Sequence, residues 1–147
     1  MGITTKQELA LEYFSNGFNC AQAVVSVFCK DYGIDTEIAL RLAGGLGGGV
    51  RAGEICGAVS GAVMVIGARY GQYIASDKDS RRKCYSETTQ FIENMKAGSS
   101  SIVCRELLGF DVSTPEGRQA QADNPDYRKT CNDMIKKAVT LLENMGL

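Results

Sequence analysis

Residues 44–61 read GGLGGGVRAGEICGAVSG, a stretch with eight glycines and one cysteine. Glycine loses more backbone freedom on folding than any other residue, so a cluster this dense predicts that something approaches the backbone closely. The segment before it, EIALRLA (37–43), is typical of a helix, and a second helical pattern runs from Ile55 to Tyr70. We therefore expect a glycine-rich loop between two helices, with Cys56 in the first turn of the second helix.

Helix signals continue on both sides of this loop. The capping-box pattern from Thr5 to Glu8 predicts a helix as far as Asn16, and Asn19 caps a second one that ends before Gly33. Further helices are expected over 35–43, 55–70, 77–97, 102–108 and 125–145, with Asn124 capping the last, and residues 110–124 are expected to form a polar loop. No segment alternates with period two. The sequence thus predicts an all-α fold, a single domain over residues 1–147 built as an irregular bundle of six to seven helices.

Charge and hydropathy exclude several classes of partner. The formal net charge is -1 and no basic run is present, so we expect no nucleic-acid partner and no binding to an anionic membrane surface. The N-terminus lacks the basic and apolar regions of a signal peptide, and the longest uncharged run, Ile55 to Ala68, is too short for membrane insertion. These features predict a cytoplasmic protein.

Nucleotide binding is disfavoured for the glycine-rich stretch. Residues 47–52 fit the pattern GxGxxA, but this fingerprint requires a preceding strand, and the preceding residues have a helical pattern. The lysine of a P-loop is missing. Gly57 and Gly61 also have an ordinary structural interpretation, since small residues on one helix face allow close helix packing.

Cysteine is the residue type that carries chemistry here, because the chain has six cysteines and no histidine. Catalysis by Ser–His or Cys–His pairs is therefore excluded. Three cysteines lie at predicted helix starts, where the helix dipole lowers a thiol pKa: Cys20, Cys56 and Cys104. The other three lie further inside helices and are expected to be buried core residues: Cys29, Cys84 and Cys131. No CxxC pair is present, so only the fold can gather the thiols into one site.

The order Cys20, Cys56-Gly57-Ala58-Val59-Ser60-Gly61, Cys104, Cys131 resembles the C_GCAxxG_C_C family, small bacterial and archaeal proteins described as redox-active. The resemblance covers most of the chain, including FNCAQAV (18–24), although this chain has Cys-Gly-Ala where the family label has Gly-Cys-Ala. The family is similar to the cysteine-bearing part of split-Soret cytochromes, which implies an iron–sulfur centre. Haem is not implied, because the attachment motif CxxCH is missing.

The resemblance implies that Cys20, Cys56, Cys104 and Cys131 form one metal site, which leaves Cys29 and Cys84 in the core. Four gathered thiolates need a cation, protons or disulfide bonds to offset their charge. We expect an iron–sulfur cluster for electron transfer or redox sensing, with Arg51 or Arg105 and helix N-termini offsetting its charge. The glycines expected to line the cofactor are Gly48, Gly49, Gly53 and Gly57.

Two alternatives stay open from the sequence. One is a dithiol/disulfide redox protein without metal, and the other is a structural zinc-binding module with four cysteine ligands. The sequence names neither a substrate nor the redox partner. Small-residue helix faces also allow a homodimer.

Overall fold

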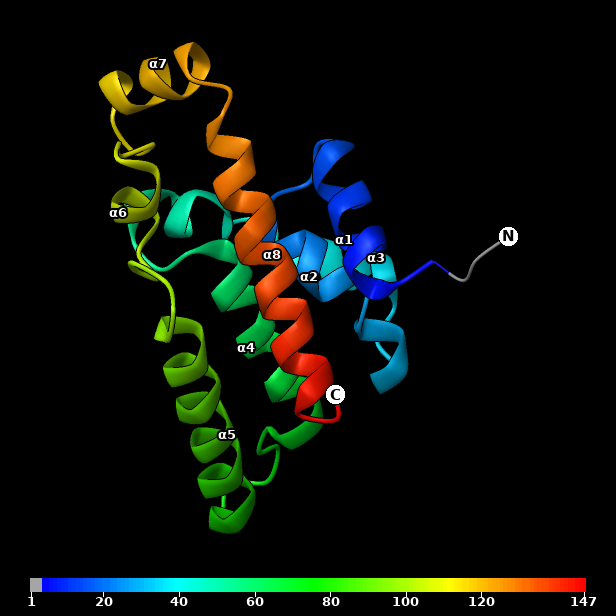
Figure 1. Cartoon of the computed structure of the whole chain (residues 1–147). Coiled ribbons are helices and arrows are strands. Elements are labelled where there is room, and N and C mark those ends of the chain that lie inside the picture. The colour runs from blue at the N-terminus through cyan, green and yellow to red at the C-terminus, as the bar shows by residue number, and fades with distance from the viewer. Residues whose placement is uncertain (1–3) are drawn as a thin grey trace.

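The computed structural model describes residues 4–147, and its regular elements in this range are helices (Figure 1). The α-helices are α1 (Lys6–Ser15), α2 (Cys20–Ser26), α3 (Thr36–Leu42), α4 (Gly57–Tyr70), α5 (Lys78–Lys96), α6 (Cys104–Leu108), α7 (Pro115–Asp123) and α8 (Tyr127–Asn144). Two short irregular turns, η1 (Cys29–Tyr32) and η2 (Gly49–Gly53), complete the described part. The all-α prediction is confirmed, with eight α-helices in these residues rather than six to seven.

Helix α4 lies at the centre of the bundle and packs against α2, α5 and α8 (Figure 1). Its buried face is built largely from small residues, which lets the α4 backbone approach that of α2 closely. The buried apolar residues of the described chain form one connected core, apart from Cys104 and Val112. Its largest fully buried side chains are Phe28, Ile66, Phe91, Met95, Ile135 and Leu142.

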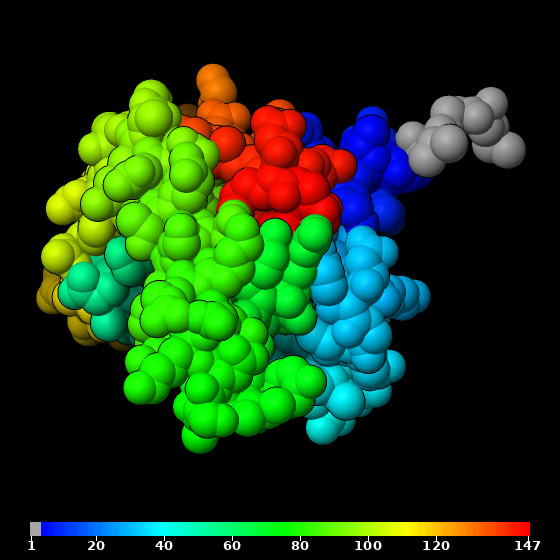
Figure 2. All heavy atoms as spheres, turned by 90° about the horizontal axis from the view of Figure 1, so that it is seen from below, coloured from blue at the N-terminus to red at the C-terminus, as the bar shows by residue number. Residues whose placement is uncertain are grey.

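The end of the bundle that faces the viewer in Figure 2 is formed by α5, by the 71–76 connection that precedes it, by the C-terminus and by the light-blue segment around η1. The predicted helix over 77–97 is confirmed as α5, and Asp77 caps it by accepting a hydrogen bond from the Ser80 N–H at 3.0 Å. Within residues 4–147, none of the helices combines the length and the apolar character that crossing a membrane demands.

The predicted second helix is interrupted. It begins as expected after Asn19, but α2 ends at Ser26 and a 3₁₀ turn starts at Cys29. The run of β-branched valines around Ser26 lowers helix propensity. The Phe28 N–H binds the Val25 carbonyl three residues back at 3.2 Å, a tighter spacing than in an α-helix.

The prediction of a loop over 110–124 is wrong, because α7 lies inside it. Thr114 caps this helix by accepting a hydrogen bond from the Gly117 N–H at 2.9 Å, and Pro115 occupies the first helical position. Both residues are typical of a helix start, so the sequence carried the signal. Asn124 consequently ends α7 instead of capping α8, which begins at Tyr127.

Candidate functional site

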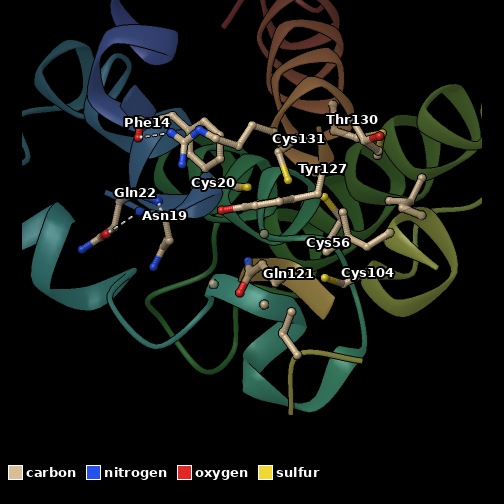
Figure 3. Close-up of a pocket in the computed structure, with 18 of the residues that line it drawn as sticks. Phe14, Asn19, Cys20, Gln22, Cys56, Cys104, Gln121, Tyr127, Thr130 and Cys131 are labelled. Atoms are coloured by element: carbon tan, nitrogen blue, oxygen red, sulfur yellow. Dashed lines mark hydrogen bonds between the residues drawn. The ribbon is translucent and has the colours of Figure 1, made fainter. Parts of the chain in front are cut away.

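Four of the six cysteines line one cavity of about 470 Å³ (Figure 3). They come from the starts of α2, α4 and α6 and from α8: Cys20, Cys56, Cys104 and Cys131. The structure thus brings together the four cysteines that the sequence pattern selected. Cys29 is buried in the core, where its sulfur lies 3.5 Å from the Ser26 carbonyl, and Cys84 lies on α5 outside the cavity.

Cys56 and Cys104 are placed by a short backbone pairing. Ile55 and Val103 form an isolated antiparallel bridge, in which the Cys56 N–H binds the Ile102 carbonyl at 2.8 Å and the Cys104 N–H binds the Glu54 carbonyl at 2.6 Å. Since successive residues of extended backbone point to opposite sides, the two cysteines share one side of the bridge. They are diagonal neighbours across it, a relation that separates Cα atoms by about 7–8 Å.

Cys20 is held at the start of α2 by a capping box. The Asn19 side chain accepts a hydrogen bond from the Gln22 N–H at 2.8 Å, and the Gln22 side chain accepts one from the Asn19 N–H at 2.9 Å. The start of α4 then packs directly on it, because a Cβ at Gly57 would lie 3.2 Å from the Cys20 Cβ. This packing sets the position of Cys20 relative to Cys56.

The glycine-rich stretch forms a left-handed turn at the edge of the cavity. Four consecutive residues, Gly48 to Arg51, have positive φ angles between 56° and 66°. Left-handed backbone costs about 1–2 kcal/mol for each residue with a side chain. Val50 and Arg51 both carry this cost, and glycine avoids it at the other two positions. The glycines at positions 48 and 49 are therefore explained by the left-handed backbone that this turn requires.

The predicted cofactor-lining glycines divide into two pairs. Gly48 and Gly57 line the cavity. Gly49 packs on the Glu54 backbone, and a Cβ at Gly53 would lie 2.6 Å from a carboxylate oxygen of Asp111, so these two glycines close the turn itself.

Burial decides the ionisation of Cys56 and Cys104, contrary to the expectation that helix starts would lower their pKa values. Desolvation raises the pKa of Cys56 to about 11, although the Ala58 and Val59 N–H groups oppose this rise. Desolvation also raises the pKa of Cys104 to about 11, together with the charges of Cys131 and Asp111. The cost of burying a thiolate therefore exceeds the benefit from these helix N-termini.

Cys20 and Cys131 form a thiol pair. A hydrogen bond between the two side chains raises the pKa of Cys20 well above its usual value and lowers the pKa of Cys131. The Arg128 guanidinium lowers the pKa of Cys131 further. Cys131 is therefore the thiol of this pair that ionises first. Its expected role as an ordinary core residue is wrong.

Arg128 is anchored next to this pair. It lies three residues before Cys131 on α8, which places both on one helix face. Its guanidinium lies 4.5 Å from the ring centre of Phe14 and donates a hydrogen bond to the Phe14 carbonyl at 3.2 Å. Sequence reasoning missed Arg128, although its spacing from Cys131 was a usable signal.

The two arginines expected to offset charge behave differently. Arg51 lines the cavity, and its charge partly opposes the rise in the pKa of the Cys104 thiol. Arg105 instead pairs with Glu54 at 2.7 Å and donates to the Gly53 carbonyl at 3.1 Å, so it stabilises the turn from outside the cavity. Tyr127 and Gln121 also line the cavity and were not anticipated (Figure 3).

Metal centres differ in how their ligands are arranged. Among the described residues, no three His, Cys, Asp or Glu side chains are grouped closely enough to hold one metal ion. A single zinc ion needs four ligands about 2.3 Å from one point. An iron–sulfur cluster takes four cysteine ligands that are shared among two or four iron atoms.

Together, these observations define a helical protein with a four-cysteine cavity. The family model described as "Putative redox-active protein (C_GCAxxG_C_C)" matches residues 18–145, and the chain belongs to this family. Neither the curated proteins nor the solved structures give a match.

Proposed function

We propose that Cys20, Cys56, Cys104 and Cys131 hold an iron–sulfur centre that serves electron transfer or redox sensing. The observation that carries this proposal is that all four thiols line one cavity of about 470 Å³. The bridge between Ile55 and Val103 supports it, because it disfavours a disulfide between Cys56 and Cys104. Diagonal neighbours across such a bridge have Cα atoms about 7–8 Å apart, which is too far for a disulfide unless the backbone moves.

The charges around the cavity suit such a centre. Four thiolates together with iron and sulfide leave a net negative charge, and Arg51 and Arg128 lie on the same cavity. The helix starts at Cys20, Cys56 and Cys104 add backbone N–H donors. Because three of the thiols have raised pKa values, binding must release their protons, and formation of the centre should be favoured as the pH rises.

The test is anaerobic purification followed by a visible spectrum and by iron, acid-labile sulfide and zinc analysis. We expect a brown protein with iron and sulfide in equal amounts. Zinc at one per chain without colour would instead indicate the structural zinc module. A colourless, metal-free chain after anaerobic reconstitution with iron and sulfide would refute the iron–sulfur proposal.

Single variants assign the ligands. Replacing Cys20, Cys56, Cys104 or Cys131 by serine should remove or destabilise the centre. Cys84→Ser is the matched control, since it changes the same atom outside the cavity. Cys29→Ala is a second control in the core. Loss of iron from both control variants would show that the ligand set is wrong.

The thiol pair favours a second candidate, a dithiol/disulfide function. The Cys131 thiolate would attack a substrate disulfide, displace one sulfur as a thiolate and form a mixed disulfide. Cys20 would then lose its proton, and its thiolate would attack the Cys131 sulfur. This step releases the second substrate thiolate and leaves a Cys20–Cys131 disulfide. Mild oxidation of the metal-free protein followed by peptide mapping tests this, and any other disulfide pairing would contradict it.

We propose a cytoplasmic location, because thiols that hold an iron–sulfur centre must stay reduced. Either redox function also requires a redox partner, whose identity the site chemistry leaves open. Assembly as a homodimer is a separate proposal, which sedimentation of the purified protein tests directly.

A further inference from the structure

We propose that the four-cysteine cavity is also a binding site for a small organic anion, with Arg51 and Arg128 recognising its carboxylate or phosphate group. This inference rests on the proposed redox site and names the class of its substrate. The juxtaposition that carries it is two guanidinium groups and four thiols on one cavity, with no carboxylate among the described residues that line it.

The two guanidinium groups are not neutralised by the protein. Five ion pairs occur among residues 4–147, and neither arginine takes part in any of them. Asp111 is the carboxylate that acts on the Cys104 thiol, but it accepts hydrogen bonds from the Ser113 N–H at 2.9 Å and from its hydroxyl at 2.6 Å. In the metal-free protein the cavity therefore presents two guanidinium groups that have no carboxylate partner among residues 4–147, although the whole chain has a net charge of -1.

The two arginines are held differently, because Arg128 is half-buried whereas Arg51 is exposed to solvent. Arg128 is fixed over the Phe14 ring, as described above. Arg51 folds back on its own turn, because a Cβ at Gly48 would lie 3.0 Å from its Nη1 atom. The guanidinium fork matches carboxylate and phosphate geometry through paired hydrogen bonds, and a fixed fork loses less freedom on binding.

The cavity is large enough for more than a metal centre. Its volume of about 470 Å³ falls within the range of about 300–1,000 Å³ that is usual for ligand pockets. An iron–sulfur cluster adds at most eight inorganic atoms. The remaining walls include the rings of Phe18 and Tyr127, which suit a flat or apolar ligand body. Tyr127 extends across the cavity in the view of Figure 3.

The test compares two aromatic disulfides on the reduced full-length chain, after circular dichroism has shown that each variant is helical. Dithiobis(nitrobenzoate) is a dianion, and dithiodipyridine is neutral and of similar size. In both reactions a protein thiolate attacks one sulfur, the S–S bond breaks, and an aryl thiolate leaves with the electron pair. The ratio of the two rates therefore isolates the effect of ligand charge, and peptide mapping identifies the cysteine that reacts first.

We expect Arg51→Gln and Arg128→Gln each to lower the anion-to-neutral rate ratio by about tenfold, as loss of a nearby unit charge predicts. Arg41→Gln is the matched control, because it removes the same charge from α3, outside the cavity. The wild-type ratio should also fall with added salt. Benzoate and inorganic phosphate, added separately, should slow the modification and so distinguish a carboxylate from a phosphate ligand.

An unchanged rate ratio in both cavity variants, or an equal loss in Arg41→Gln, would overturn the inference. Failure of protection by both benzoate and phosphate would also count against it. These measurements use the reduced thiols alone, so their failure is distinguishable from failure of the iron–sulfur proposal. A protein that holds iron but shows no charge preference refutes only the anion site, and a metal-free protein with the preference refutes only the centre.

Discussion

Gly61 is the position where a single added methyl group should disturb the site most clearly. It lies on the face of α4 that packs against α2. A Cβ at this position would lie 2.7 Å from the carbonyl oxygen of Ala21 and 2.8 Å from its Cα atom. Ordinary contact begins at 3.4 Å, so the two helices must separate by about 0.7 Å. Ala21 directly follows Cys20, so this movement also displaces one wall of the cavity.

The expected cost of Gly61→Ala follows from two opposing effects. Overpacking a well-packed interface costs about 1–3 kcal/mol. Alanine in a helix interior gains about 0.5–1 kcal/mol over glycine. The net result should be a loss of about 1–2 kcal/mol in the free energy of unfolding, which for a chain of this size lowers Tm by roughly 2–8 °C.

Gly67→Ala is the control on the same helix. No atom lies within 4 Å of a Cβ built at Gly67, so this variant should gain helix propensity alone and become more stable by about 0.5–1 kcal/mol. Chemical denaturation and iron retention would be measured for both variants. Equal stability of the two variants would refute the view that direct backbone contact between α2 and α4 sets the position of Cys20.

Three further predictions concern local structure. Asn19→Ala removes the capping box with Gln22 and should cost about 1 kcal/mol of stability in urea unfolding, with weaker iron retention; unaltered stability would mean that the cap is redundant. Val50→Gly should stabilise the protein by about 1 kcal/mol, because the left-handed backbone at Val50 is costly and its half-exposed side chain contributes little packing. A measured loss of stability would contradict the view that the backbone at Val50 is strained. Hydrogen bonds from Ser80 lower the pKa of Asp77, so this carboxylate stabilises the fold above its unfolded pKa and the effect is lost as the pH falls through the lowered value. Asp77→Ala should therefore lower Tm at pH 7 but not at about pH 2, and an equal loss at both pH values would disprove this linkage.

Local signals were sufficient for most of the helices. Thr5, Asn19 and Asp35 each accept a hydrogen bond from an N–H three residues ahead, as their sequence patterns predicted. A cap and its partner are neighbours in the chain, so the sequence alone is enough to identify them. Thr114 and Pro115 carried the same kind of signal for α7 and were overlooked because the surrounding residues are polar.

The interruption of the second helix illustrates the limit of local patterns. The residues from Cys20 to Tyr32 have helical periodicity throughout, yet the chain tightens into a 3₁₀ turn before Gly33. The valines around Ser26 weaken the helix preference here, and Phe28 is fully buried where the helix is interrupted. Tertiary packing overrides a weak helix preference in such a segment.

By itself the sequence determined the helical class of the protein, the family and which four cysteines to consider. Only the tertiary structure decided that these thiols share a cavity, since the bridge between Ile55 and Val103 joins segments far apart in the chain. It also decided that Cys131, and not the thiols at helix starts, has the lowered pKa. Desolvation and charge pairing depend on neighbours in space, and a linear pattern of residues does not contain them.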